Sequence, residues 1–222
     1  MSRSESEPLL APTFLFRFSS RCLPHAPIWS ERGAALGEVH RLPNFGQLEG
    51  KRTFADIRAG WATSGLAISI RVEGKKQPPW CRGTRIEDSD GVHLFLDTRD
   101  THNVHRAGRF CHHYALLPRG AGSRLDQPLA QFLPIARARE ISRPAAATTV
   151  TVRTEQRVDG YLLEAFLPAR ALAGYDPVDH PRLGFTYAVV DRELGWQTYS
   201  VGPEFPIFED PSLWGTLELV AT

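Results

Sequence analysis

The chain has 222 residues, of which 42% are hydrophobic, and this length suits one large β domain with a sizeable core. Its formal net charge of +1 excludes the strong electrostatic field that would attract nucleic acid or an anionic membrane surface. Partners must therefore be recognised at a local site. A run of about 18 apolar residues, which a membrane-spanning helix needs, does not occur in the sequence.

The N-terminal segment, MSRSESEPLLAPTFLFRF, carries acidic residues where a signal peptide needs positive charge, and prolines interrupt its apolar run. A cytoplasmic location is therefore expected. The three cysteines are scattered, and their spacing matches neither a disulfide framework nor a zinc ribbon. Reduced thiols are the expectation for all three.

Short runs rich in β-branched and aromatic residues, separated by Gly, Pro and Asp, predict about ten strands. In chain order they are residues 13–18, 53–61, 65–74, 91–98, 109–118, 148–156, 161–168, 183–192, 195–201 and 214–220. At most one short helix is expected, in the segment PARALAG that Pro168 opens and Gly174 closes. This pattern predicts an all-β fold, an antiparallel β-sandwich of jelly-roll type, with residues 1–222 forming a single domain.

Two of the predicted strands differ in how their faces are patterned. Residues 65–74 alternate, with the apolar side chains on one face, so this strand is expected to be half-buried. Residues 91–98 are apolar on both faces, which predicts a central strand covered on both sides. Long polar loops, 74–91 and 99–108, flank that central strand, and loops on a rigid scaffold are where binding residues gather.

Two tryptophans stand outside the alternating apolar runs, Trp80 in a polar loop and Trp196 directly after a turn glycine. An indole left exposed in this way can stack on the C–H face of a sugar ring, while polar side chains reach the hydroxyls. The alternative is that each indole caps the core. The predicted ligand-binding residues are Trp80, Arg82, Arg85, Asn103, His105, Arg109 and Trp196.

The same region carries the residue types that bind metals. His102, His105 and His112 are candidate zinc ligands, and Asp88 and Asp90 are candidates for a structural calcium. Adjacent strand residues point to opposite faces, so His112 and His113 cannot both join one site. The alternative is that these side chains are hydrogen-bonding groups of loops and strand ends.

Catalytic motifs are absent from the sequence: it has no nucleophile elbow, zinc-protease helix motif, phosphate loop or dinucleotide fingerprint. No catalytic residue is therefore nominated, and an enzyme is the less favoured interpretation. Two alternatives to sugar binding stay open. One is an interaction domain for a protein or an anionic ligand, and the other is a metal-dependent enzyme centred on residues 102–113. The oligomeric state is not predicted.

Five phrases occur in the order seen in family 9 carbohydrate-binding modules and their relatives. They are GWATSGLAISIRVEG (60–74), DSDGVHLFLDTRD (88–100), GYLLEAFLPARAL (160–172), LGFTYAVVDRE (183–193) and DPSLWGTLEL (210–219). The chain resembles this superfamily over roughly residues 50–220, with an N-terminal strand and loop extension before it.

The resemblance implies a non-catalytic β-sandwich, often with structural calcium, that holds the ends of sugar chains between two exposed tryptophans. Trp80 and Trp196 are nominated for that pair from their loop positions. The loop rich in His and Arg carries more charge than a neutral sugar requires, so the expected carbohydrate is neutral or anionic. Nucleic acid and membrane are not expected partners.

Overall fold

The computed structural model describes residues 12–142 and 150–221. Within these ranges the chain forms eleven strands. They are β1 (Ser19–Pro24), β2 (Ala55–Ala62), β3 (Gly65–Glu73), β4 (Gly91–Asp97), β5 (Cys111–Ala121), β6 (Gln127–Leu133), β7 (Thr151–Arg157), β8 (Gly160–Pro168), β9 (Arg182–Asp191), β10 (Gly195–Thr198) and β11 (Gly215–Leu219). Short 3₁₀ turns occur at η1 (Pro12–Leu15), η2 (Glu38–His40), η3 (Phe45–Glu49), η4 (Ile86–Asp88), η6 (Ala169–Ala171) and η7 (Pro211–Leu213). No helix in the described ranges is long and apolar enough to cross a membrane.

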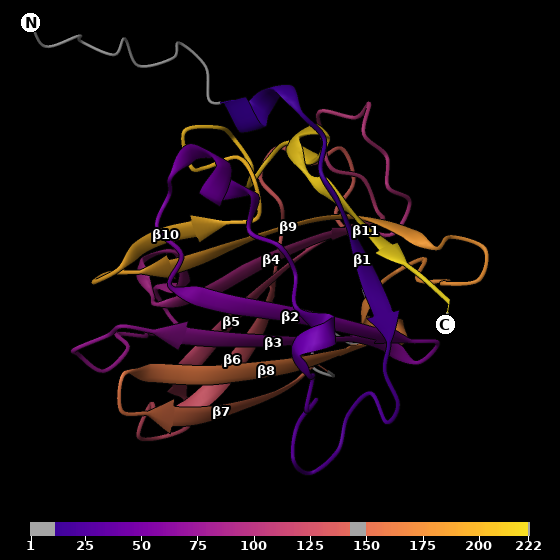
Figure 1. The fold of residues 1–222 in the computed structure, drawn as a ribbon. Helices are drawn as coiled ribbons and strands as arrows, with labels where there is room; N and C mark the ends of the chain where they lie inside the picture. Colours follow the sequence, from indigo (N-terminus) through magenta and orange to yellow (C-terminus); the bar gives the residue numbers. More distant parts are fainter. Residues whose placement is uncertain (1–11, 143–149, 222) are drawn as a thin grey trace, which may run out of the picture.

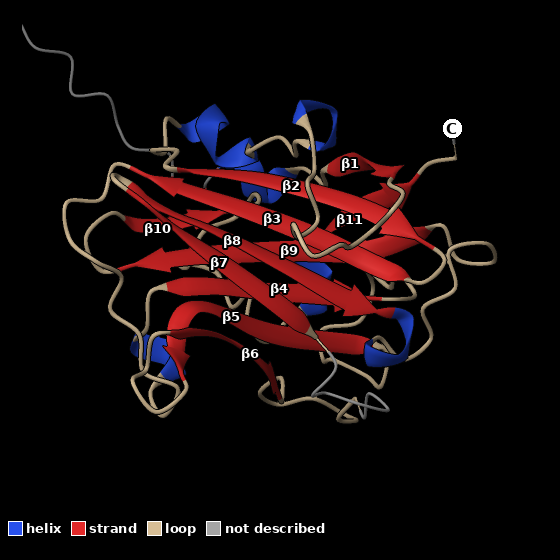
Figure 2. Ribbon diagram, turned by 90° about the horizontal axis from the view of Figure 1, so that it is seen from below, coloured by secondary structure: helices blue, strands red, loops and turns tan. Residues whose placement is uncertain are grey.

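The strands pack as two layers (Figure 1). One layer has the order β6-β5-β4-β9, and both β10 and β11 pair with the far side of β9. The other layer has the order β2-β3-β8-β7. β1 joins the two layers because it pairs in parallel with β11 through Ser19–Cys22 and with β2 through Leu23 and Pro24. All other strand pairs are antiparallel, which confirms the predicted β-sandwich (Figure 2).

The core lies between the layers and draws alternate residues from both. Leu66, Ile68 and Ile70 of β3 face Leu94 and Leu96 of β4 within one cluster of fully buried side chains. Every residue of β4 is buried, as the two apolar faces of that segment predict. The outer face of this layer is therefore also covered, by the loops that follow β4, β6 and β10.

The prediction that only one face of β3 is buried is wrong. Ala67 and Ser69, on the face opposite the core, are also buried. The reason is the loop between β1 and β2, whose Ala34 and Leu36 pack against Ala67. The small side chain of Ala67 leaves room for this loop to approach the strand closely. The alternating pattern of the strand cannot show that a distant loop covers its second face.

One predicted strand is wrong, and one strand of the structure was not predicted. Residues 13–18 begin in η1 instead of a strand, since Thr13 is fixed by hydrogen bonds to Glu49 and the strand starts only at Ser19. The sequence analysis does not predict β6, because the strand contains Pro128 and its residues are partly exposed without a clear buried face. Proline is tolerated there because β6 lies at the edge of its layer. The other predicted strands are present, and residues 148 and 149 of the predicted 148–156 strand lie outside the described residues.

Candidate functional site

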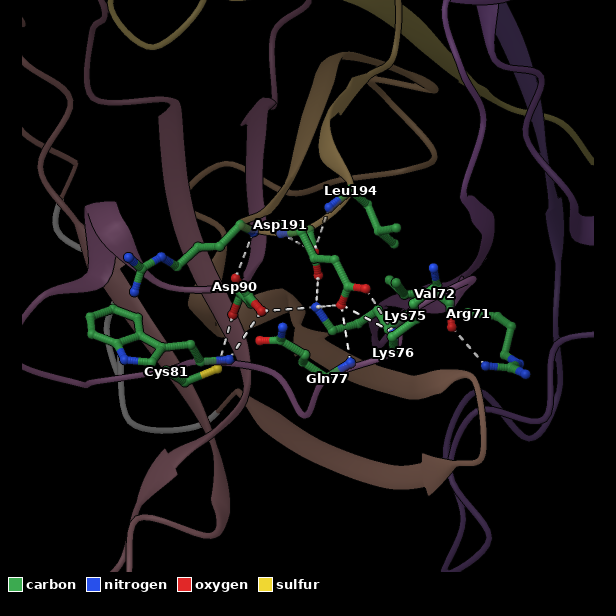
Figure 3. Close-up of polar contacts among 12 residues, drawn as sticks. Arg71, Val72, Lys75, Lys76, Gln77, Cys81, Asp90, Asp191 and Leu194 are labelled. Atoms are coloured by element: carbon green, nitrogen blue, oxygen red, sulfur yellow. Dashed lines mark hydrogen bonds and ion pairs between the residues drawn. The ribbon is translucent and has the colours of Figure 1, made fainter.

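A buried ion cluster joins Lys75 to Asp90 and Asp191 (Figure 3), and Asp90 also binds the loop that carries Trp80. The Lys75 ammonium is 2.5 Å from Asp191 Oδ2 and 3.1 Å from Asp90 Oδ2, and all three side chains are at most 2% exposed. Burial alone would lower the pKa of Lys75, but the hydrogen bonds and charges of Asp191 and Asp90 outweigh it and raise this pKa. The ammonium therefore stays charged inside the protein.

The two carboxylates of the cluster also tie down the backbone of both neighbouring loops. Asp90 accepts hydrogen bonds from the backbone N–H groups of Trp80 (3.0 Å) and Arg192 (2.9 Å). Asp191 accepts from the N–H groups of Glu193 and Leu194, each at 2.9 Å. The cluster thus links the Trp80 loop to the β9–β10 turn, and charge-assisted bonds of this kind hold the two segments in a fixed relation.

Trp80 and Trp196 line one cleft of about 580 Å³ beside this cluster. Trp196 follows Gly195 at the start of β10 and is 42% exposed, and Trp80 is partly exposed. Gly195 has a φ of +93°, which brings the chain around from β9 in a conformation that other residues rarely adopt. The turn therefore places Trp196 on the same cleft as Trp80, from a segment more than a hundred residues away in the sequence.

Charged side chains of both signs surround the indoles. The Arg192 guanidinium carbon lies 4.4 Å from the centroid of the Trp80 ring, and that of Arg82 lies 5.2 Å from it. These are cation–π distances. Arg85 pairs with Asp88, and both side chains line the cleft. The cleft therefore offers the Trp196 indole, a Trp80 indole flanked by guanidinium groups, hydrogen-bond donors from those groups and acceptors from carboxylates.

Three of the residues predicted to bind ligand lie elsewhere. Asn103, His105 and Arg109 are in the loop after β4, whereas the Trp80 loop precedes β4. β4 has seven residues and separates the loops by about 20 Å, at ~3.3 Å per residue. His105 is hydrogen-bonded to Asp210 (3.1 Å), and Arg109 lies over the Phe110 ring. The structure brings Trp80, Arg82, Arg85 and Trp196 together, and it does not bring the other three to them.

The candidate zinc ligands do not converge. His102 pairs with Asp100 at 2.7 Å, and the buried His112 accepts a hydrogen bond from the backbone N–H of Ala173 at 2.8 Å. Nowhere in the described part of the chain do three or more His, Cys, Asp or Glu side chains form a group that could hold a metal ion. The zinc expectation stays a prediction without support from this geometry.

The two candidate calcium ligands also have different surroundings and different partners. Asp88 is exposed and pairs with Arg85, whereas Asp90 is buried against the Lys75 ammonium. The Lys75 ammonium therefore stands beside Asp90, where the sequence analysis expected a calcium ion. Calcium therefore also stays a prediction, and the contacts of these two carboxylates are accounted for by side chains of the protein.

A second hollow adjoins the cleft, since Trp196 and Glu87 line both. It measures about 360 Å³ and is lined by Glu87, His93, His113, Leu133, Pro134, Trp196 and Phe208. His93 and His113 reach it from β4 and β5, which pair directly, and Nδ1 of His93 lies 2.9 Å from Nε2 of His113. Sequence reasoning misses this pair because it treats both strands as scaffold. The signal that could have found it is a histidine on the outer face of each strand.

Solved structures with the same architecture identify the class of fold as that of family 9 carbohydrate-binding modules. A module of this family from Caldicellulosiruptor kristjanssonii in complex with cellotriose is similar over 92% of this chain and 95% of that chain, with a TM-score of 0.61 and 15% identity. Another structure of a family 9 module from this organism, in complex with glucose, gives a TM-score of 0.62 and 15% identity over 92% of this chain and 97% of that one.

A proposed carbohydrate-binding protein from Bacteroides uniformis is similar as well, with a TM-score of 0.61 and 12% identity over 92% of this chain and 100% of that chain. No family model matches the sequence, and no curated protein does. The fold predicted from the five sequence phrases is thus confirmed by structural likeness.

Proposed function

We propose that this protein is a non-catalytic carbohydrate-binding domain that takes a sugar ring in the cleft between Trp80 and Trp196. The observation that carries the proposal is that two partly exposed indoles, from distant segments, line one cleft of about 580 Å³. This volume lies within the range of about 300 to 1,000 Å³ in which proteins bind small molecules. Solved structures of the same fold hold cellotriose and glucose, which supports a sugar as the ligand.

The chemistry of the cleft suits a neutral sugar better than an anionic one. An indole face packs against the apolar C–H face of a pyranose ring, and each hydroxyl can both donate and accept. Guanidinium groups of Arg85 and Arg192 supply donors, and the carboxylates of Glu87 and Asp88 supply acceptors. An anionic ligand would be repelled by these carboxylates, so the mixture of signs favours hydroxyl recognition.

The test is calorimetric titration with glucose and cellotriose, with the tryptophan fluorescence recorded in parallel. Trp80→Ala and Trp196→Ala should each weaken binding about tenfold or more, which corresponds to ~1.4 kcal/mol. The matched control is Trp29→Ala, because Trp29 stacks on Phe166 of β8 in the other layer (ring centroids 6.3 Å apart). Binding that neither cleft substitution changes, or a glycan array without any ligand for the folded protein, would overturn the proposal.

A further inference from the structure

The cleft between the two indoles adjoins two further hollows. The hollow of about 360 Å³, here the Phe208 hollow, shares Trp196 and Glu87 with the cleft. A third hollow of about 390 Å³, here the Gln77 hollow, shares Trp80 and Arg192 with the cleft. The two outer hollows have no lining residue in common. The cleft therefore lies between them.

The Gln77 hollow lies where the chain leaves β3 and carries several polar groups. It is lined by Lys75, Gln77, Pro78, Trp80, Asp90, Arg192 and Glu193. Gln77 and Arg192 are exposed residues, and an amide both donates and accepts hydrogen bonds while a guanidinium donates them. Pro78 adds an apolar surface beside them. The hollow therefore offers what a sugar unit needs, which is partners for hydroxyls next to a surface for C–H groups.

The Phe208 hollow continues the aromatic wall of the cleft. The Phe208 and Trp196 rings pack against each other, with their centroids 5.8 Å apart. Because Trp196 lines both spaces and Phe208 lines the hollow, the two rings form one aromatic surface that extends from the cleft into the hollow. The C–H face of a pyranose packs against such a surface, and the Glu87 carboxylate beside it can accept a hydrogen bond from a hydroxyl.

Open space on two sides of the cleft decides which part of a sugar chain fits. A site that accepts only chain ends must exclude a further sugar, which needs a group that would clash with it. Here the cleft is followed on each side by a hollow large enough for a small molecule, since such sites start at about 300 Å³. Exposed residues lie at both outer hollows, Gln77 and Pro78 at one and Pro134 at the other. A sugar in the cleft can therefore carry a neighbour at each of its two linkages.

The buried ion cluster gives the cleft and the Gln77 hollow a common floor. Lys75 and Asp90 line the hollow, and Asp191, which pairs with the same ammonium, lines the cleft. All three side chains are buried and tied to one another. A chain that spans both spaces therefore meets a preformed surface, and a preformed surface loses little conformational entropy on binding.

We infer that the three spaces form one groove that binds the interior of a neutral polysaccharide chain, with one sugar in the cleft and at least one further sugar on each side. This inference rests on the proposed function for the central sugar. It differs from the recognition of chain ends that the family resemblance implies, because it makes the ligand a run of linked sugars within a chain.

Calorimetric titration with glucose, cellobiose and cellotriose tests the length of the groove. The affinity should rise at each step and by about tenfold or more in total, because each added sugar occupies another of the three spaces. An affinity that reaches its full value with glucose or cellobiose would overturn the inference, since at least one outer hollow would then be unused.

The number of protein molecules bound per polymer chain separates interior binding from end binding. The probe is a soluble, unsubstituted β-glucan of known chain length, titrated to saturation. Interior binding predicts several protein molecules per chain, whereas recognition of one kind of chain end permits only one. Borohydride reduction of the reducing end of cellohexaose should change its affinity by less than about twofold. One protein molecule per polymer chain, or none, would overturn the inference.

Substitutions in the outer hollows locate the groove. Leu133→Trp narrows the Phe208 hollow and Gln77→Trp narrows the Gln77 hollow. Each should weaken cellotriose binding about fivefold and change glucose binding by less than about twofold. Gln127→Trp and Lys76→Trp are the matched controls, because both residues are exposed, lie on the same two segments and line none of the three spaces. Cellotriose binding that neither hollow variant weakens would contradict the location.

The same titrations distinguish a failure of this inference from a failure of sugar binding. If glucose and cellotriose bind equally well and the polymer takes one protein molecule per chain, the groove fails while the proposed function stands. If glucose, every oligomer and the polymer all fail to bind the folded protein, the proposed function fails and the groove fails with it.

Discussion

Lys75 lies at the centre of the contacts that fix two loops of the cleft. Its ammonium offsets the charges of Asp90 and Asp191, and these carboxylates in turn hold the backbone of Trp80 and Arg192. Breaking a buried ion pair by removing one partner leaves an uncompensated charge inside the protein. The cluster therefore couples stability to the position of the Trp80 loop.

Lys75→Met should lower the free energy of unfolding by about 3 to 5 kcal/mol, because both carboxylates lose their counter-charge in a buried site. Urea denaturation followed by tryptophan fluorescence measures this change. Lys76→Met is the matched control, since the Lys76 side chain is exposed and its expected effect is within about 0.5 kcal/mol. If the two variants are equally stable, the cluster is not what holds the loop.

The charged side chains around the indoles lead to a prediction about salt. Because Arg85 and Arg192 are balanced by Glu87 and Asp88 in the same cleft, a neutral oligosaccharide should bind without strong ionic steering. The affinity for cellotriose should change by less than about twofold between roughly 50 and 500 mM sodium chloride. An oligomer of glucuronic acid is the comparison. If that oligomer binds more tightly than cellotriose and weakens steeply with salt, the ligand is anionic.

At the scale of single residues, the sequence predicted the two indoles of the cleft and missed the groups that support them. Trp80 and Trp196 could be nominated because each stands in a loop outside an apolar run. The partners of Lys75, by contrast, are 15 and 116 residues away in the chain. Contacts at such separations depend on strand order and register, which local patterning does not encode. The same holds for Asn103 and His105, whose loop lies near Trp80 in sequence but at the other end of β4.

At the scale of elements, the hydrophobic pattern predicted those strands whose alternation or continuous apolar run distinguishes them from the neighbouring loops. β4 is the clearest case, because an apolar run on both faces permits only a covered central strand. Patterning failed where packing overrides propensity. Thr13 anchors a 3₁₀ turn through Glu49 although an aromatic run follows it, and the edge strand β6 contains a proline.

The β9–β10 turn yields a test of how an element positions the site. Gly195 has a φ of +93°, and a methyl group added there would meet no atom within 4 Å, so Gly195→Ala meets only the backbone penalty. That penalty is about 1 to 2 kcal/mol, and the turn should shift Trp196 and weaken cellotriose binding. Gly37→Ala is the control, because Gly37 has equally free surroundings and a φ of −77°. Thermal unfolding and titration of both variants measure the effects, and equal melting temperatures would contradict the role of the turn.

At the scale of the whole molecule, the buried histidines make stability depend on pH. Burial is the largest cause that lowers the pKa of His40, His93, His112 and His113, and it brings the pKa to about 4 for His93 and His112 and to about 3 for His113. In the unfolded chain these groups bind protons below about pH 6.5. Between about pH 6.5 and 4 the unfolded state therefore holds more protons than the folded state, so acid favours unfolding there.

The free energy of unfolding should consequently fall as the pH is lowered from 7 to 5, by up to about 1.4 kcal/mol per pH unit for each such histidine. Burial alone would raise the pKa of Asp100, but its hydrogen bonds to His102, Thr216 and Arg182 outweigh burial and lower this pKa. Carboxylates of this kind lose their stabilising effect only at lower pH. Urea denaturation at a series of pH values measures the slope. His112→Gln should reduce it, while His105→Gln, at an exposed position, should not. A stability that is constant from pH 7 to 5 would contradict the prediction, because it would show that the folded and unfolded states take up protons equally over this range.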